Sequence, residues 1–451
     1  MSSLIKKFFK EGHERTIKVK KNIAISFFFK GLSIVINLAF VPLTLNYLNP
    51  TYYGVWLTIG SIAGMLNFFD IGLGNGLRNK FAESRAKGLD ALAREYVSTT
   101  YAALTIISAI LFISFTIIHH FINWNAVLNV PQDNNTELAK VVYIVFSFYF
   151  LQFVLSIIGT ILNADQKSSI NNFFNFLYTL LSFIVVYFLN IYSQASLYYL
   201  SLALAGIPSL VFFVSSLYLF NTTYKKFSPK LEFVQIKHLK IIARLGISFF
   251  IIQLNAIILF STGNIIITQT LSPAEVTPYN IAFKYFGVIT MGYNIFVTPF
   301  WSGFTDAYHR GDKQWIKRTM KNLNLISIGI AALLFIMVIF SNYIYTLWVG
   351  TEVKVPFRLS VLMAFYVLIT TWMIPFVYFM NGIGKLKLQL FLSIITCIIN
   401  IPISIFFSVT MELGITGIIL GPIICITPYA LLMPIQYDKV INNKAKGIWN
   451  G

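Results

Sequence analysis

Apolar residues occur along this chain in long runs, often eighteen residues or more, separated by short segments that contain Pro, Gly and charged residues. A run of this length allows a helix to cross the hydrocarbon core of a membrane. The pattern predicts twelve membrane-spanning helices. We place them at 22–47, 53–77, 96–118, 141–162, 173–190, 197–219, 246–268, 279–301, 322–345, 359–381, 388–408 and 415–436.

Composition agrees with this pattern. Of the 451 residues, 57% are hydrophobic and only 11% are charged, whereas a soluble domain carries about 25% charged residues. The only cysteines, Cys397 and Cys425, lie inside predicted spans, which argues against a disulfide framework. We therefore expect an all-α integral membrane protein.

The basic residues are distributed unevenly between the two sides of the predicted spans. The net charge of +18 would suggest a nucleic-acid partner in a soluble chain. Here 29 of the 34 Lys and Arg residues fall on one side, 3 fall on the other, and Lys30 and Lys284 lie within spans. The positive-inside rule then predicts that both termini are cytoplasmic. The charge indicates orientation, and no nucleic-acid partner is expected.

Short motifs recur at an offset of 222 or 223 residues. They are Ile25–Phe28 with Ile247–Phe250, Phe81–Gly88 with Phe304–Gly311, and Pro50 with Pro273. Each pair falls at the same place in a unit of six spans, and an even number of spans makes the units parallel repeats. We expect two six-helix bundles around a central cavity. The predicted divisions are a cytoplasmic segment 1–21, a bundle 22–220, a basic linker 221–245, a bundle 246–437 and a cytoplasmic tail 438–451.

Three ionisable residues, Lys30, Asp70 and Lys284, lie alone inside predicted spans. Such a group costs about 2.5–3.5 kcal/mol at the centre of the membrane and usually faces a cavity that serves transport. Two cations against one anion favour an anionic cargo. Lys284 lies between aromatic residues with no acidic residue in its own span, so it either binds phosphate as a point charge or extends to the outer surface.

The stretch that begins at Asp70 closes the second span and contains Gly72, Gly74 and Gly76. Alternate glycines weaken a helix and permit close approach of another backbone. Lys30 and Asp70 lie at similar depths on neighbouring spans. They form either a pair that cargo or a proton makes and breaks, or a permanent ion pair that only joins two helices. In the first case Asp70 is the candidate coupling residue.

Other polar residues extend the candidate site. Arg78 lies at the cytoplasmic mouth, where phosphate would first arrive, although it also satisfies the positive-inside rule. Amides suit sugar hydroxyls but commonly bridge helices instead. The amides that we consider for substrate binding are Asn37, Gln152, Gln253 and Asn255.

The sequence contains no nucleotide-binding loop, metal-ligand cluster or nucleophile–base arrangement, and no His lies inside a span. An ATP-driven pump or a membrane enzyme would need such a site. We therefore expect no enzymatic activity, no cofactor and no metal.

The stretch Phe-Phe-Asp-Ile-Gly-Leu-Gly-Asn-Gly-Leu-Arg-Asn-Lys-Phe-Ala-Glu, which ends at Glu83, resembles the signature of bacterial polysaccharide-export flippases. These O-antigen and capsular flippases are members of the multidrug/oligosaccharidyl-lipid/polysaccharide exporter superfamily. Supporting matches are Val41–Thr44, Tyr53–Trp56, Trp301–Tyr308 and Asn381–Lys385. The chain departs from the pattern at Gly263-Asn264, where related chains often carry an Asp before the Asn, and this puts a symmetric two-acid coupling scheme in doubt.

The resemblance implies a MATE-like fold. It also implies that the protein moves undecaprenyl-diphosphate-linked oligosaccharide across the bacterial cytoplasmic membrane by alternating access. The implied partners are this lipid-linked oligosaccharide, membrane lipids, and a polysaccharide polymerase with its chain-length regulator.

Three alternatives remain open from the sequence. They are a drug or organic-ion antiporter of the same superfamily, an oligosaccharide polymerase or glycosyltransferase, and a non-transporting component of a glycan-assembly complex. An antiporter for organic cations would be expected to have an acidic cavity. A polymerase would be expected to have a large extramembrane loop or an acidic cluster, and neither feature is present in the sequence.

Overall fold

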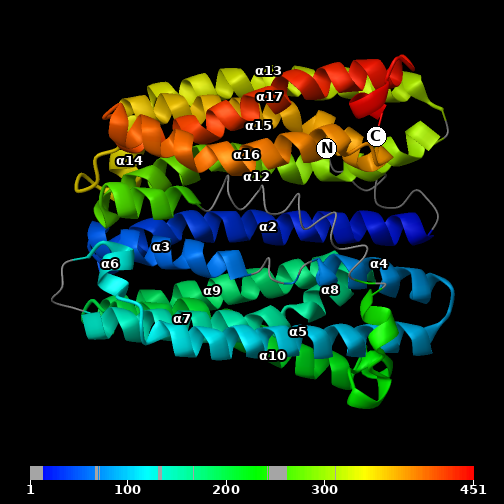
Figure 1. The fold of residues 1–451 in the computed structure, drawn as a ribbon, viewed down its shortest axis with the longest axis horizontal. Coiled ribbons are helices and arrows are strands. Elements are labelled where there is room, and N and C mark those ends of the chain that lie inside the picture. Colours follow the sequence, from blue (N-terminus) through cyan, green and yellow to red (C-terminus); the bar gives the residue numbers. More distant parts are fainter. Residues whose placement is uncertain are drawn as a thin grey trace. The chain divides into compact units, whose positions relative to one another are not determined.

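The computed structural model describes residues 14–66, 70, 72–130, 135–165, 167–240, 242, 262–309 and 311–450. All regular secondary structure in these residues is helical (Figure 1), as predicted. The first helices are α2 (Glu14–Tyr47), α3 (Pro50–Met65), α4 (Leu73–Ala86), α5 (Asp90–His119), α6 (Trp124–Leu128), α7 (Asn135–Leu155), α8 (Ile157–Ala164), α9 (Ser168–Tyr192) and α10 (Leu197–Asn221). After the helical residues 262–270 come α12 (Pro273–His309), α13 (Lys313–Ile339), α14 (Ser341–Val349), α15 (Phe357–Ile383), α16 (Lys387–Ile405), the π-helical turn η5 (Phe406–Thr410) and α17 (Ile415–Ile441).

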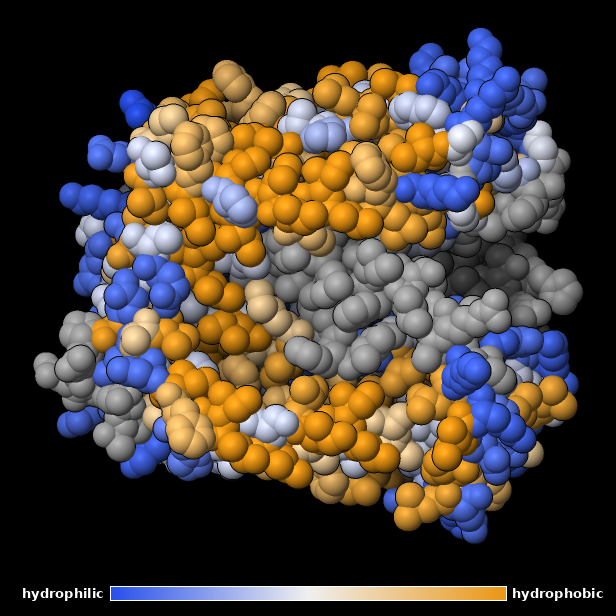
Figure 2. Space-filling view, viewed as in Figure 1, coloured by the Kyte–Doolittle hydropathy of each residue, from blue (hydrophilic) through white to orange (hydrophobic). Residues whose placement is uncertain are grey.

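Within the described residues, 10 helical segments are long and apolar enough to cross a membrane, judged by length and composition. They coincide with ten of the twelve predicted spans. The second predicted span, 53–77, is instead divided between α3 and α4, and the seventh, 246–268, lies largely outside the described residues. Figure 2 shows apolar side chains over the middle of the helices and hydrophilic side chains at their ends. The protein is therefore a multi-pass membrane protein.

The chain divides into two compact units. The first comprises Met1–Asn49 and Ile62–Phe250, and the second comprises Pro50–Ser61 and Ile251–Gly451. The first part of α3 thus belongs to the second unit, although it lies far from the rest of that unit in sequence. The predicted boundaries at 220 and 246 remain a prediction.

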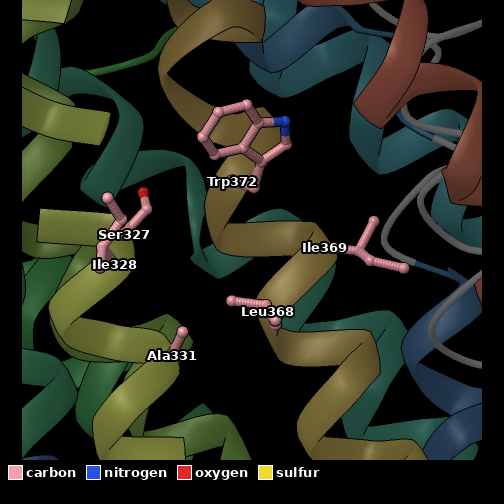
Figure 3. A pocket seen from close by; sticks show the side chains of 6 residues that line it. All are labelled: Ser327, Ile328, Ala331, Leu368, Ile369 and Trp372. Atoms are coloured by element: carbon pink, nitrogen blue, oxygen red, sulfur yellow. The ribbon is translucent and has the colours of Figure 1, made fainter. Parts of the chain in front are cut away.

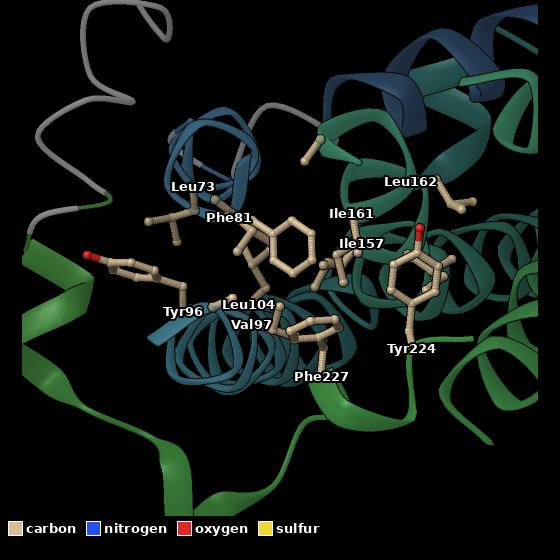
Figure 4. Packing of buried hydrophobic residues seen from close by; sticks show 14 of the residues in the cluster. Leu73, Phe81, Tyr96, Val97, Leu104, Ile157, Ile161, Leu162, Tyr224 and Phe227 are labelled. Atoms are coloured by element: carbon tan, nitrogen blue, oxygen red, sulfur yellow. The ribbon is translucent and has the colours of Figure 1, made fainter. Parts of the chain in front are cut away.

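In the first unit, a hydrophobic cluster joins one end of α4, α5 and α8 to the segment after α10 (Figure 4). Phe81 of α4 is fully buried there, and its ring meets that of Phe227 edge to face at a centroid distance of 5.3 Å. Phe227 lies in the short 3-10 helix η3 (Lys225–Phe227). The beginning of the predicted linker is therefore part of the core of the first unit.

The next residues of the linker dock on α5. The Arg94 guanidinium donates to the Ser228 carbonyl at 3.1 Å and lies over the ring of Phe233 in η4 (Leu231–Phe233). His238 Nε2 lies 2.7 Å from a carboxylate oxygen of Glu95. Specific contacts thus hold the described part of this basic segment against the first unit.

In the second unit, carbonyls that prolines leave without a helical partner accept hydrogen bonds from neighbouring helices. A proline has no N–H, so the carbonyl four residues earlier loses its helical partner. In α17, Pro434 leaves the Ala430 carbonyl free, and Trp372 Nε1 of α15 donates to it at 3.2 Å. Side chains of neighbouring helices supply the missing bonds, as expected where water is excluded.

A side-chain hydrogen bond to a carbonyl that a proline leaves free also connects α16 to α17. Pro422 leaves the Ile418 carbonyl without a helical donor, and the Ser404 hydroxyl donates to it at 3.2 Å. A Cβ atom placed on Gly421 would lie 1.9 Å from the Ser404 hydroxyl. The two helices therefore approach as closely as the glycine allows.

The glycine stretch after Asp70 breaks the second predicted span. Gly72 has a φ of 75° and precedes α4, a left-handed conformation that glycine adopts without strain. A Cβ on Gly76 would lie 2.4 Å from the Ile242 carbonyl oxygen, so the expected close backbone approach occurs at this glycine. At the positions 223 residues later, the second half has Ile295, Val297 and Pro299, and α12 is continuous over 37 residues.

Positions related by the repeat offset have similar local roles. Pro50 and Pro273 each begin a helix. Phe81 and Phe304 are both 0% exposed. Gly88 and Gly311 follow these helices with φ of 71° and 75°. The arrangement of the two halves as parallel six-helix repeats remains a prediction.

Candidate functional site

The second unit contains a row of polar side chains that we call the polar seam. It is formed by three helical segments, residues 50–61 of α3, the helical residues 262–270 and the first turns of α12. Its members are Tyr53, Thr58, Ser61, Asn264, Thr268, Thr277, Asn280 and Lys284.

Lys284 lies at one end of the seam, where its ammonium donates to the Tyr53 hydroxyl at 3.0 Å. The same nitrogen lies 5.7 Å from the centroid of the Tyr53 ring. In the described part of the chain no acidic side chain pairs with Lys284. An ammonium has three donors, and the Tyr53 hydroxyl uses one, so the half-buried charge retains the capacity to bind an anion.

Amides and hydroxyls continue the seam. Asn280 donates to the Asn264 side-chain oxygen at 2.7 Å, and Asn264 donates to the Ser61 hydroxyl at 2.9 Å. The hydroxyls of Thr58 and Thr268 lie 2.6 Å apart. The seam thus consists of bonded polar groups that end at a cation.

Backbone contact brings these segments together. A Cβ on Gly54 would lie 1.8 Å from the Pro273 carbonyl oxygen, so α3 and the start of α12 touch at this glycine. The Thr277 hydroxyl donates to the Pro50 carbonyl at 2.6 Å. These two contacts fix the ends of α3 and α12 against each other and place Tyr53 opposite Lys284.

Asp70 lies in the break between α3 and α4, in the first unit. One carboxylate oxygen accepts from the Gly72 N–H at 2.9 Å and the other accepts from the Gly74 N–H at 3.1 Å. These are among the N–H groups that a helix start leaves without partners. A carboxylate there also interacts favourably with the helix dipole.

No ion pair joins Lys30 to Asp70 in the described structure, where the Asp70 carboxylate accepts from two backbone N–H groups. The prediction assumed one continuous helix from 53 to 77. The structure instead places Asp70 between α3 and α4, two residues before the left-handed Gly72.

Lys30 and Asn37 are exposed and lie seven residues apart, which places them on one side of α2. The neighbouring side of α2 packs on α9, where Phe29 meets Phe173 at 5.2 Å and Phe40 meets Phe183 at 5.4 Å. Asn37 donates to the Ser33 carbonyl one turn earlier.

Arg78 is exposed on α4. The other cations of this helix have acidic partners. Lys80 donates to Glu83 at 2.8 Å, and this contact together with Lys87 lowers the pKa of Glu83 to about 2. Arg85 pairs with Asp90. Arg78 has no acidic partner in the described part of the chain, and its candidate role remains a prediction.

Gln152 lies half-buried in α7. Gln253 and Asn255 lie outside the described residues. The structure groups Lys30 with Asn37 and places Lys284 in the seam. The roles that we predicted for these residues remain predictions.

Sequence reasoning missed Tyr53, Asn280 and the threonines of the seam. Residues 277, 280 and 284 follow the i, i+3, i+7 spacing of one helix face, so α12 carried a detectable signal. Tyr53 belongs to the matched motif Tyr53–Trp56, but its contact with Lys284 carried no signal, because 231 residues separate the two.

Comparison with known proteins adds three results. No family model matches the chain. A Yersinia pseudotuberculosis protein provisionally named as an O-antigen export protein is 25% identical over 374 residues, covering 79% of this chain and 81% of that protein. A Salmonella typhimurium protein provisionally named as an O-antigen transporter is 23% identical over 400 residues, covering 86% and 89%.

Solved structures share the fold. An inward-facing multidrug resistance MATE family transporter of the MOP superfamily is 14% identical, covers 94% of this chain and 98% of its own, and has a TM-score of 0.75. An outward-facing one is 15% identical, covers 95% and 96%, and has a TM-score of 0.64. These similarities are to transporters, in agreement with the prediction that the chain is not an enzyme. The chain has the fold of MATE transporters and resembles in sequence, over most of its length, proteins named for O-antigen export, which confirms the resemblance that its motifs indicated.

Proposed function

We propose that this protein is a flippase that moves undecaprenyl-diphosphate-linked oligosaccharide repeat units, of O-antigen or capsular type, across the bacterial cytoplasmic membrane. The observation that carries the proposal is the similarity, over about four fifths of the chain or more, to proteins provisionally named for O-antigen export and transport. The likeness to multidrug transporters is at 14–15% identity and concerns the fold alone.

In this proposal, Lys284 binds the diphosphate. Its ammonium retains donors beyond the bond to Tyr53, and no acidic side chain of the described residues neutralises it. A point charge on a flexible stem suits a phosphate that must be bound and then released.

Lys30 and Arg78 are the other proposed diphosphate contacts, because both are exposed cations without an acidic partner in the described structure. Asn37 lies on the same side of α2 as Lys30 and would contact sugar hydroxyls. Gln152, Gln253 and Asn255 are proposed for the same role on the chemistry of their amides.

The proposed architecture has twelve spans in two six-helix bundles, related as parallel repeats around a central cavity that alternates in access. Both termini and the segment 221–245 are proposed to be cytoplasmic, because 29 of the 34 basic residues then lie inside. A polysaccharide polymerase and a chain-length regulator are the proposed protein partners. Reporter fusions at Lys230 and at Asn135 should report opposite sides of the membrane, and equal signals would contradict the orientation.

The decisive experiment replaces Lys284. We expect Lys284→Ala to accumulate lipid-linked oligosaccharide on the inner leaflet at near-normal protein level, and Lys284→Arg to retain part of the export. Lys354→Ala is the matched control, because Lys354 is an exposed lysine in a predicted external loop. Normal export by Lys284→Ala, or an equal defect in the control, would contradict the role of Lys284. Export of organic cations without any glycan phenotype would favour the antiporter alternative.

A further inference from the structure

The second unit contains two adjoining depressions on α13 that the proposed function does not use. A polar groove of about 420 Å³ lies between α13 and α17. An apolar cavity of about 310 Å³ lies between α13 and α15 (Figure 3). Ile328 lines both of them, so the two depressions adjoin at this side chain.

The shared wall is one face of α13. Lys317, Lys321, Asn324, Ile328 and Ala331 follow each other at intervals of four and three residues, the spacing of a single helix face. At 1.5 Å per residue, the stripe extends about 21 Å from Lys317 to Ala331. It changes from cationic to apolar over about the depth of one membrane leaflet.

The polar groove is suited to an anion. Lys317 donates weakly to the Asn442 side-chain oxygen at 3.4 Å, and Asn442 donates to Asp438 at 2.8 Å. Lys321 has no ion pair within the described residues. Asp438 is the acidic residue that lines the groove, so the two lysines leave an excess of positive charge there.

Asn324 adds an unused polar group to the same groove. Its side-chain oxygen is buried and has no hydrogen-bond partner in the described structure. An amide of this kind can bind a hydroxyl or a phosphate oxygen. The groove therefore has both a charge and a hydrogen-bonding group for a ligand.

The polar groups among the residues that line the apolar cavity already donate hydrogen bonds to backbone carbonyls. The Ser327 hydroxyl donates to the Leu323 carbonyl at 3.2 Å, and Trp372 Nε1 donates to the Ala430 carbonyl. The remaining lining residues, Ile328, Ala331, Leu368 and Ile369, are aliphatic. The cavity suits a hydrocarbon chain.

We propose that these two adjoining depressions together bind an anionic phospholipid of the cytoplasmic leaflet, with the phosphate at Lys317 and Lys321 and an acyl chain along Ile328 and Ala331. Basic pockets between membrane helices on this side are known to hold anionic headgroups. The order of the two depressions along α13 matches the order of the parts of such a lipid. Such a lipid site is independent of the identity of the transported cargo.

The test uses the full-length chain purified in detergent, with phosphatidylglycerol and phosphatidylcholine of identical acyl chains as probes. Native mass spectrometry should show preferential retention of phosphatidylglycerol. The double variant Lys317→Gln/Lys321→Gln should bind it about 30-fold more weakly, since each lysine contributes a preference of about fivefold. Lys444→Gln/Lys446→Gln, which removes two exposed lysines outside the groove, should retain the preference.

The apolar half has its own control. Ala331→Phe fills the cavity and should weaken the binding of both lipids. Ala332→Phe, at an exposed neighbouring position outside the cavity, should leave the binding of both lipids unchanged. Thermal unfolding without added lipid verifies that the variants are folded. Equal losses of lipid binding in the test and control variants would overturn the proposal. Displacement of phosphatidylglycerol by a polyprenyl diphosphate at equal stoichiometry would also overturn it, because the groove would then be a cargo site. Dimerisation that buries the groove would also overturn it.

Discussion

Replacing Asp70 tests whether its carboxylate stabilises the start of α4. Its two oxygens accept from the N–H groups of Gly72 and Gly74. Loss of a side-chain cap costs about 0.5–2 kcal/mol, and loss of a favourable charge at a helix start costs about 0.3–1 kcal/mol more. We expect Asp70→Ala to lower the free energy of unfolding by about 2 kcal/mol. Asp70→Asn, which keeps one acceptor oxygen, should lower it by about 1 kcal/mol.

A double-mutant cycle with Lys30 separates this role from an ion pair. Since no ion pair joins Lys30 to Asp70 in the described structure, Lys30→Met and Asp70→Asn should act additively within about 0.5 kcal/mol. The measurement is the free energy of unfolding in a sodium dodecyl sulfate titration. A coupling of several kcal/mol, as expected for a broken buried pair, would refute the capping interpretation.

Export measurements then address coupling. Gly72→Ala is the matched control, because a side chain at a φ of 75° strains the same helix start by about 1 kcal/mol while the carboxylate remains. If Asp70 carries the coupling proton or cation, Asp70→Asn should lose export and its pH dependence while Gly72→Ala of equal stability exports normally. Equal loss in the two variants would show that only the geometry of the helix start matters.

Three further changes test the contacts described above. Tyr53→Phe should leave Lys284 without its hydroxyl partner and reduce export several-fold at normal protein level; unchanged export would separate the seam from transport. Gly54→Ala should destabilise the second unit by about 1–3 kcal/mol, because the new Cβ would meet the Pro273 carbonyl; a stability equal to wild type in the same titration would contradict this close contact. Phe227→Ala should cost about 3–5 kcal/mol and make the linker susceptible to trypsin, and an unchanged digestion pattern would show that the linker is not held by this ring.

The sequence was sufficient to predict the membrane class and most of the spans, because apolar length is a local property that a bilayer reads directly. It failed at the second span, where hydropathy continues through residues 53–77 but the left-handed backbone at Gly72 interrupts the helix before α4 begins. The signal was present in Gly72, Gly74 and Gly76, and we had already expected weakening there. Hydropathy does not include the hydrogen bonds from the Gly72 and Gly74 N–H groups to the Asp70 carboxylate. These bonds favour the start of a new helix over continuation of the preceding one.

The candidate site was less predictable than the fold. Isolated charges can be recognised in a sequence, and Lys284 was recognised in this way. Its contact with Tyr53 depends on how residues 50–61 pack with α12, which no local pattern encodes. The linker shows the same limitation. Its composition identified it only as a basic linker, whereas the buried Tyr224 and Phe227 make its beginning part of a core.

The break after α3 also has a consequence for biogenesis. A helix of 16 residues is about 24 Å long, shorter than the roughly 30 Å of a hydrocarbon core. In the folded protein, α3 by itself is therefore too short to cross the hydrocarbon core. Only Leu48 and Asn49 separate it from the much longer α2, so the two helices should enter the membrane as one hairpin during synthesis. In the proposed orientation, the residues at 70–79 then remain at the cytoplasmic surface until later helices of the first unit cover them, and a mutation that impairs the insertion of α2 should also impair that of α3.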